Sequence, residues 1–132
     1  MKVRVGDTAA FSRTITDEMV RAFAATTGDH NRVHLDDDYA SGTRFKRRIA
    51  HGMLTASLIS SVLANELPGD GTVYLSQSLK FVAPVYLGDT VTARVTVTNV
   101  REDKPVATLE TVCVNQRGEV LIKGEAVVLF AA

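Results

Sequence analysis

The second half of the chain alternates apolar and polar residues with a period of two, which is the pattern of half-buried β-strands. The alternation is clearest in residues 90–100, where valine and alanine at the odd positions from Val91 to Val97 alternate with threonine and arginine. Turn sequences such as LGD, EDKP and NQRG separate this run from the others, which are residues 72–81, 106–114 and 120–130. We therefore predict an antiparallel meander, with one further strand near residues 5–15.

Helical patterns occupy the first half of the chain. Residues 16–28 predict an amphipathic helix with Thr16 as its N-cap and Gly28 as its end. A second, short helix should begin at Asp36, because the acidic residues that follow would complement its dipole. Residues 52–66 differ, because they combine a wide apolar face with small residues and carry no charge up to position 65. A helix without a charged face is normally buried on most sides.

One apolar helix and one long antiparallel sheet pack economically when the sheet curls around the helix. The sequence therefore predicts an α+β class protein with a single hot-dog fold, in which residues 1–132 form one domain and the helix 52–66 lies at its centre. The flat outer edges of such a sheet favour pairing with a second copy, so we expect a homodimer.

Composition narrows the possible partners. Lys+Arg and Asp+Glu both number 15, so the formal net charge is zero, which argues against nucleic acid as the main partner and suits a surface buried in an oligomer. The single cysteine, Cys113, rules out an internal disulfide and a multi-cysteine zinc site. Since no apolar run is long enough to span a membrane and no signal peptide opens the chain, we expect a cytoplasmic protein without a membrane partner.

The candidate chemistry begins in the polar segment TTGDHNRVHLDDDYA, residues 26–40. Asp29 and His34, on a predicted loop, could converge on one water molecule and divide general acid and base work between them. A metal site using His30 and His34 is the alternative, but Gly28 and Asn31 argue against the helix that such spacing needs, and we predict no metal. The loop could also hold such a pair by chance.

A second feature is the sequence IAHGM, in which His51 and Gly52 directly precede the buried helix. The first N–H groups of a helix lack partners inside it and carry positive potential. At Gly52, without a Cβ, such a group could polarise a substrate carbonyl as an oxyanion hole does. Alternatively, Gly52 is only a turn residue.

Three sequences together resemble a known family. They are GD-x-N-x-x-H-x-D from Gly28 to Asp36, F-x-x-x-IAHGM from Phe45 to Met53, and SQSLKFVAPVYLGDTV at residues 76–91. The chain resembles the MaoC-like hydratases, and more narrowly the short (R)-specific enoyl-CoA hydratases that supply polyhydroxyalkanoate synthesis. The similarity runs nearly from end to end.

The resemblance implies roles for individual residues. Asp29 and His34 would bind and activate water, and the Gly52 N–H would bind the thioester carbonyl. The residues expected to bind substrate or shape its pocket are Asn31, His51, Ser60, Leu63 and Val128. The substrate would be an acyl-CoA thioester, the product an (R)-3-hydroxyacyl-CoA, and no cofactor would be required. The size of the pocket residues suggests a preference for short to medium acyl chains.

One position departs from the family pattern, because Arg32 stands where the family usually has proline. The basic run Arg44, Lys46, Arg47 and Arg48 could meet the phosphates of CoA or of acyl carrier protein, or could be a solvated loop. Two other functions stay open: a (3R)-hydroxyacyl-acyl carrier protein dehydratase, and a non-catalytic hot-dog protein that binds acyl-CoA.

Overall fold

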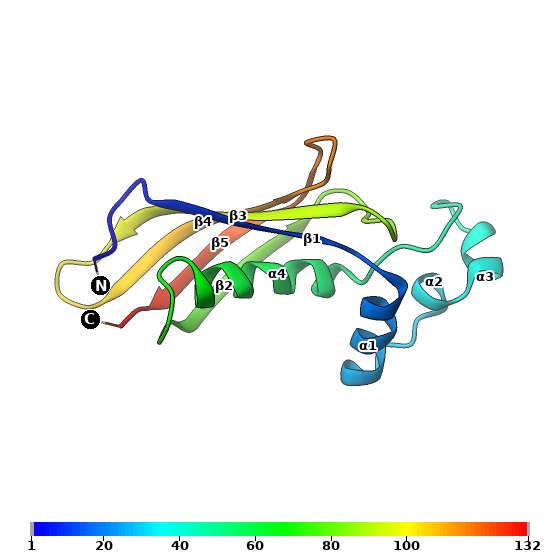
Figure 1. Cartoon of the computed structure of the whole chain (residues 1–132), viewed down its shortest axis with the longest axis horizontal. Coiled ribbons are helices and arrows are strands. Elements are labelled where there is room, and N and C mark those ends of the chain that lie inside the picture. Colours follow the sequence, from blue (N-terminus) through cyan, green and yellow to red (C-terminus); the bar gives the residue numbers. More distant parts are fainter. Residues whose placement is uncertain (1, 132) are drawn as a thin grey trace.

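A five-stranded antiparallel sheet curves over one long helix in the computed structural model, which describes residues 2–131 (Figure 1). The helix is α4, Gly52–Asn65. The strands are β1 Thr8–Thr14, β2 Val73–Phe81, β3 Thr90–Val100, β4 Val106–Val114 and β5 Val120–Leu129. The predicted single hot-dog fold is confirmed, while positions 1 and 132 of the predicted domain lie outside the described residues.

The predicted meander is only partly right. The strand order is β1-β3-β4-β5-β2, so β3, β4 and β5 form a meander while β2 lies at the far edge beside β5. The chain between β2 and β3 does not fold as a hairpin, because it pairs instead with the segment before α4. There the Ala50 N–H donates to the Val85 carbonyl at 2.7 Å, and Ile49 forms a bridge with Tyr86.

A bulge in β2 changes which side chains share a face. The register with β5 shifts between Tyr74 and Ser76, so Tyr74 lies opposite buried Val128, and Leu75 drops out of the ladder. The simple alternation predicted for residues 72–81 is therefore wrong in its first half. As a result Leu75 is 54% exposed although it belongs to an apolar run.

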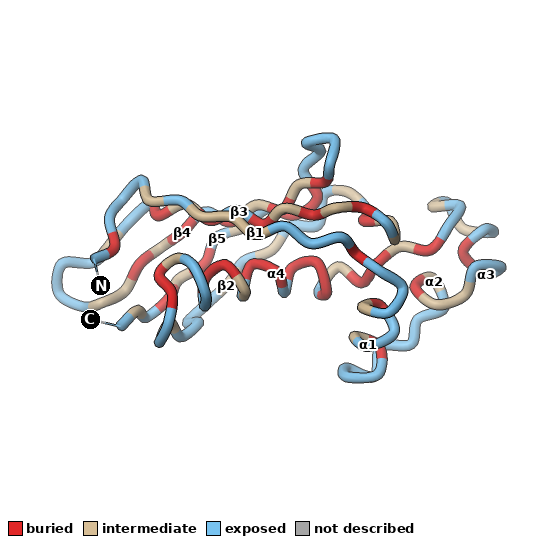
Figure 2. Tube along the Cα trace, viewed as in Figure 1, coloured by how far each residue is buried: buried red, intermediate tan, exposed pale blue. Residues whose placement is uncertain are grey.

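The core lies between α4 and the concave face of the sheet, where the buried stretches of both meet (Figure 2). The odd positions of β3 from Val91 to Val97 are fully or almost fully buried, as the alternation predicts. The other side of α4 is not covered, since Met53 is 56% exposed and Ser57, Ser60 and Ala64 are exposed below it. In a single chain the helix is therefore buried along the face toward the sheet and exposed along one stripe, so the predicted burial is confirmed only in part.

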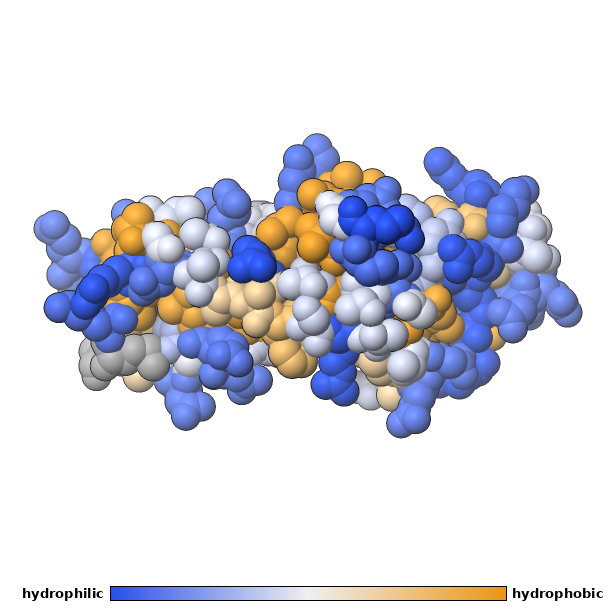
Figure 3. Space-filling model, turned by 45° about the horizontal axis from the view of Figure 1, so that its top comes forward, coloured by the Kyte–Doolittle hydropathy of each residue, from blue (hydrophilic) through white to orange (hydrophobic). Residues whose placement is uncertain are grey.

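Three shorter helices gather at one end of the sheet: α1 Asp17–Thr27, α2 Arg32–Leu35 and α3 Asp37–Ser41. Hydrophilic side chains dominate this end of the molecule (Figure 3). The predicted caps are confirmed, because the side chains of Thr16 and Asp36 accept N–H groups of α1 and α3, and Gly28 ends α1 with φ of 81°. Within residues 2–131, no helix has the length and apolar character needed to cross a membrane.

Candidate active site

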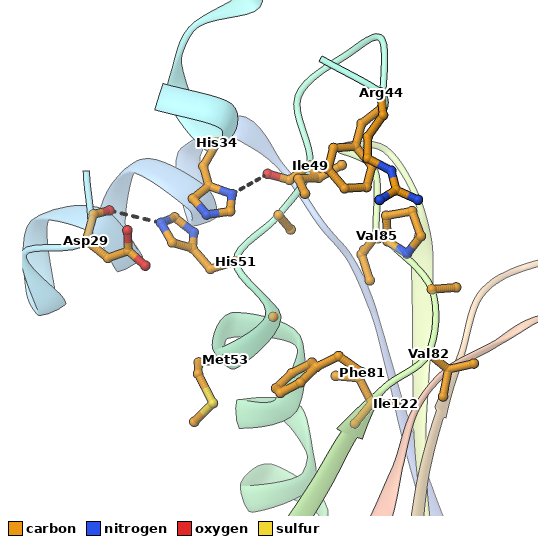
Figure 4. Close-up of a pocket in the computed structure, with 15 residues that line it drawn as sticks. Asp29, His34, Arg44, Ile49, His51, Met53, Phe81, Val82, Val85 and Ile122 are labelled. Atoms are coloured by element: carbon orange, nitrogen blue, oxygen red, sulfur yellow. Dashed lines mark hydrogen bonds between the residues drawn. The ribbon is translucent and has the colours of Figure 1, made fainter. Parts of the chain in front are cut away.

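The predicted pair Asp29 and His34 lies between the small helices and the start of α4 (Figure 4). The left-handed turn at Gly28 releases the chain from α1, and the Asp29 carboxylate accepts the N–H of Asn31 at 3.2 Å. The Asn31 side chain in turn accepts the N–H of Val33 at 3.2 Å and so caps α2. The loop predicted for His34 is wrong, because this local capping makes a short helix that carries it.

His34 is held in one tautomer by a main-chain carbonyl. Its ring is buried, at 9% exposure, and Nδ1 lies 2.8 Å from the Ile49 oxygen. Because a carbonyl oxygen only accepts, Nδ1 must carry the hydrogen, and the neutral ring keeps a lone pair on Nε2. Burial lowers the pKa of His34, against the opposing effect of the Ile49 bond, and this favours the neutral form.

His51 is packed behind the same pair. Its ring stacks on His34 with centroids 3.9 Å apart and is bounded on another side by Phe23. Its Nε2 donates to the main-chain carbonyl of Asp29 at 3.0 Å. The side chain is 2% exposed, and Nδ1 is buried without a hydrogen-bond partner among the described residues. Its one side-chain hydrogen bond among the described residues is therefore to the protein, and the substrate binding expected of it stays a prediction.

Arg48 is a site residue that the sequence did not single out from its basic run. Its side chain is 9% exposed; Nε donates to the His34 carbonyl at 2.7 Å and Nη2 to the Asp17 carboxylate at 2.6 Å. The adjacent Ile49 N–H reaches the Val33 carbonyl at 3.3 Å. Arg48 and Ile49 thus tie α2 to the chain that enters α4, and no local pattern distinguishes this buried arginine from its exposed neighbours.

Gly52 is the first residue of α4, and its N–H has no acceptor within residues 2–131. A Cβ at this position would lie 2.7 Å from the ring of Phe81, closer than packing allows. The glycine therefore lets the aromatic ring of β2 close over the helix N-terminus. Phe81 is a second residue that the sequence did not indicate, because only the fold brings the end of β2 to this helix.

A pocket of about 610 Å³ joins these groups, a size typical of sites for small ligands. Its walls include Asp29, His34, His51, Gly52, Phe81 and Ile122. Three residues expected to shape the acyl pocket do not line it: Leu63 and Val128 are buried in the core, and Ser60 is exposed on the outer side of α4. The structure thus brings the predicted water-handling groups together but leaves these three residues apart from them.

A metal would have Asp29, His34 and His51 as ligands, since these side chains offer donor atoms within 4.8 Å of one another. The two imidazoles, however, are stacked with only 29° between their planes. Ring lone pairs lie in the ring plane, so stacked rings direct them along similar lines instead of toward one point. The arrangement therefore suits a water molecule held between an oxygen and a nitrogen better than a metal ion.

The basic run before α4 divides into different roles. Arg48 is buried, and the guanidinium of Arg47 stacks on Tyr86 at 4.0 Å from the ring centroid. Arg44 is exposed and lines the pocket. Arg32, the departure from the family pattern, is the first residue of α2, a position that also suits proline, and its guanidinium lies 4.3 Å over Tyr39.

Comparison with known proteins places this arrangement in a family. The family described as "MaoC like domain" matches residues 3–117. An (R)-specific enoyl-CoA hydratase from Rhodospirillum rubrum is 48% identical over 130 residues, covering 98% of this chain and 90% of that protein. One from Aeromonas caviae is 51% identical over 126 residues, covering 96% and 94%.

Solved structures agree with the sequence comparison. The structure described as an (R)-hydratase from A. caviae involved in PHA biosynthesis superposes with a TM-score of 0.96 at 50% identity, and 98% of each chain is covered. The match therefore extends over the sheet, the central helix and the segment with Asp29 and His34. This chain belongs to the MaoC-like family, as the three sequences predict.

Proposed function

We propose that this protein hydrates trans-2-enoyl-CoA reversibly to (R)-3-hydroxyacyl-CoA. The observation that carries the proposal is the meeting of the Asp29 carboxylate and the His34 Nε2 in one pocket with the Gly52 N–H, which has no acceptor within residues 2–131. The relatives of about 50% identity that are named (R)-specific enoyl-CoA hydratases support the same reaction.

Asp29 and His34 would hold the attacking water between them. A carboxylate oxygen and the Nε2 lone pair of neutral His34 are both acceptors, so each can take one hydrogen bond from the water and leave an oxygen lone pair for C3. As the C3–O bond forms, the pair accepts one proton from the water and returns it to C2. Both additions come from one side of the double bond, which makes the hydration syn.

The Gly52 N–H would bind the thioester oxygen. Negative charge builds on this oxygen as water adds to C3, and an unpaired N–H at a helix N-terminus is suited to receive it. The thioester itself makes C3 electrophilic. We therefore propose that the reaction requires no metal and no redox cofactor; for the metal, the stacked geometry of His34 and His51 supports the proposal. Activity that survives exhaustive treatment with a chelator would agree with it.

CoA recognition is proposed for Arg44, the cation of the basic run that is exposed and borders the pocket. A guanidinium at the mouth suits the phosphates of CoA. Replacing Arg44 with alanine should raise KM for crotonyl-CoA several-fold with little effect on kcat, and should not affect the matching pantetheine ester, which lacks the nucleotide. Equal effects on both esters would contradict this assignment.

The central test is hydration of crotonyl-CoA, followed as the loss of enoyl-thioester absorbance, with chiral analysis of the product. Asp29→Asn keeps the size of the side chain but removes the base, and should lower the rate by about 10²–10⁴-fold, the usual scale for an acid–base group. Folding of the variant is checked by circular dichroism. Near-normal hydration by folded Asp29→Asn would reject the mechanism.

Two alternatives are separated by the same assay. A dehydratase of acyl carrier protein would prefer the carrier-bound substrate over crotonyl-CoA in a direct comparison of kcat/KM. A non-catalytic binding protein would bind the CoA ester without any loss of absorbance. The high identity to CoA hydratases favours the first proposal over both.

The metabolic role and the cellular location of the protein are also proposals. The relative described as involved in PHA biosynthesis supports a supply role for polyhydroxyalkanoate or fatty-acid metabolism, which deletion and measurement of stored polymer would test. A cytoplasmic location is also proposed and can be checked by cell fractionation.

We also propose a homodimer formed through the β2 edge and the uncovered side of α4. At the edge Val73, Tyr74 and Leu75 are each more than 40% exposed, an unusual density of large apolar groups for a surface that faces water. The neighbouring side of α4 carries no charge. A second copy would bury both surfaces.

A further inference from the structure

One side chain contacts both members of the proposed catalytic pair. The Nε2 of His51 donates to the main-chain carbonyl of Asp29, and the His51 ring covers one face of His34. Phe23 packs on the His51 ring with centroids 4.8 Å apart, so the imidazole has little freedom to turn. The His51 ring thereby fixes the positions of Asp29 and His34, which come from different segments, relative to each other (Figure 4).

Histidine is an unusual choice at position 51, because only one of its two ring nitrogens has a hydrogen-bond partner among the described residues. A carbonyl accepts from Nε2, so the neutral ring leaves Nδ1 unprotonated, and this atom is buried without a hydrogen-bond partner among the described residues. A buried polar atom without a partner is costly, and an apolar ring would avoid that cost. Histidine here combines a flat ring for stacking with an N–H directed at Asp29, which no other natural side chain of this size provides.

We propose that His51 is a positioning residue for hydration, which fixes the main chain of Asp29 and holds the ring of His34 neutral and aimed at the water. It acts through the other two residues, and its one side-chain hydrogen bond among the described residues is to the Asp29 carbonyl. This inference rests on the proposed function, and it assigns His51 a different role from the substrate binding implied by the family resemblance.

The neutral state of His34 follows from its surroundings. The titratable and charged groups that contact it from neighbouring segments are the His51 ring, Asp29, and the Arg48 guanidinium on its main-chain carbonyl. Burial is the main cause that lowers the pKa of His34, and the His51 ring lowers it further, while the Ile49 hydrogen bond and the Asp29 carboxylate oppose this effect.

Two substitutions separate the two contacts. His51→Gln retains an N–H that can reach the Asp29 carbonyl but removes the stacked ring, and His51→Phe retains a ring but removes the donor. Each should lower kcat/KM for crotonyl-CoA by about 10- to 100-fold, the scale of a small misplacement of reacting groups. In both variants the acid limb of the pH profile should move to higher pH, because His34 loses a neighbour that opposes its protonation.

The matched control is Thr55→Val. Thr55 lies one turn further along α4, is fully buried and, like His51, has a side-chain polar atom without a partner among the described residues. It should leave both kcat/KM and the pH profile unchanged. A purely structural role for His51 would lower the folded fraction without moving the acid limb. Folded His51→Gln and His51→Phe with unchanged kcat/KM and an unchanged pH profile would overturn the proposal.

The wild-type protein offers a test that does not depend on a variant folding. Nitrogen-15 NMR of the imidazoles should find hydrogen on Nδ1 of His34 and on Nε2 of His51 in their neutral forms. The opposite tautomer of His51 would overturn the proposal whether or not the protein hydrates enoyl-CoA. A wild-type protein without hydratase activity but with these tautomers would reject the proposed function and keep the contacts that define the positioning.

Discussion

At the scale of single residues, the site is defined by which nitrogen of each histidine carries hydrogen. His34 donates Nδ1–H to the Ile49 carbonyl, so its Nε2 carries the lone pair that would accept a hydrogen bond from the attacking water. His51 donates from Nε2 to the Asp29 carbonyl, which is the opposite arrangement. These assignments follow from main-chain carbonyls, because an oxygen acceptor leaves no choice of tautomer.

The pH dependence of hydration should therefore report His34. Protonation fills the Nε2 lone pair, so kcat/KM should fall as the pH drops through the pKa of His34. Since burial lowers that pKa, the acid limb should lie below the ordinary imidazole value of about 6.5. A pH series with crotonyl-CoA measures the limb, and His30→Gln, at an exposed histidine, should not move it. An acid limb above 6.5 would contradict the neutral His34.

At the scale of elements, three short segments are fastened by one buried guanidinium. Arg48 joins the first turn of α1, through Asp17, to the carbonyl of His34 in α2, and it immediately precedes the segment that enters α4. Asp17 also pairs with Arg21 one turn along α1. The position of α2, and with it His34, depends on charged hydrogen bonds more than on the few apolar residues of such a short helix.

This link should be visible in stability as a function of pH. Hydrogen bonds from Arg48 and Arg21 lower the pKa of Asp17 in the folded protein. The ionised carboxylate therefore stabilises the fold fully above the pKa of Asp17 in the unfolded chain, about 3.9. This stabilisation is lost as the pH falls through the lower pKa of the folded state. Asp17→Asn should therefore destabilise the protein at pH 7, by about 1–2 kcal/mol for a half-exposed charged hydrogen bond.

Urea unfolding at several pH values measures the difference in unfolding free energy between wild type and Asp17→Asn. This difference should become smaller below about pH 3.9. Asp103→Asn is the matched control, because it removes an ion pair with Arg101 in which both side chains are largely exposed. That variant should have the stability of the wild type at pH 7. A loss for Asp17→Asn that is the same at all pH values would show that the carboxylate charge is not responsible.

At the scale of the whole molecule, the single chain leaves two adjoining surfaces unusually apolar. The opposite edge of the sheet, β1, is lined by hydroxyl pairs such as Ser12 with Thr92 and Thr14 with Thr90. The β2 edge instead exposes Val73, Tyr74 and Leu75. This asymmetry favours the β2 edge for the proposed dimer, because pairing there removes large exposed apolar side chains from water.

Leu75→Lys should weaken the dimer strongly, since a two-fold axis would bring both copies of the lysine into the interface. The dissociation constant should rise by about 100-fold or more, corresponding to roughly 3 kcal/mol. Light scattering during size-exclusion chromatography measures the change. Val5→Lys, at a 64% exposed valine away from this edge, should leave the wild-type mass unchanged. A monomeric wild type, or a Leu75→Lys variant as dimeric as wild type, would reject the interface.

The sequence by itself predicted most of the elements, although not the short helix α2, and it selected the candidates for the reacting pair. Period-two runs mark β3, β4 and β5 because alternation is a local property of a strand, and the uncharged helix and its glycine start are equally local. Asp29, His34 and Gly52 could be selected because three sequences, taken together, resemble one family. The same local signals could not reveal the position of β2 or the bulge at Leu75.

Tertiary structure alone decided what surrounds the pair. The backing of His34 by His51, the burial of Arg48 within a basic run and the closure of Phe81 over Gly52 all join residues that are distant in the chain. No periodic pattern along the sequence predicts these three contacts, because a side-chain hydrogen bond or stack depends on where two segments meet in space. Patterns along the chain determined which residues could react, and packing between segments decided how they are held.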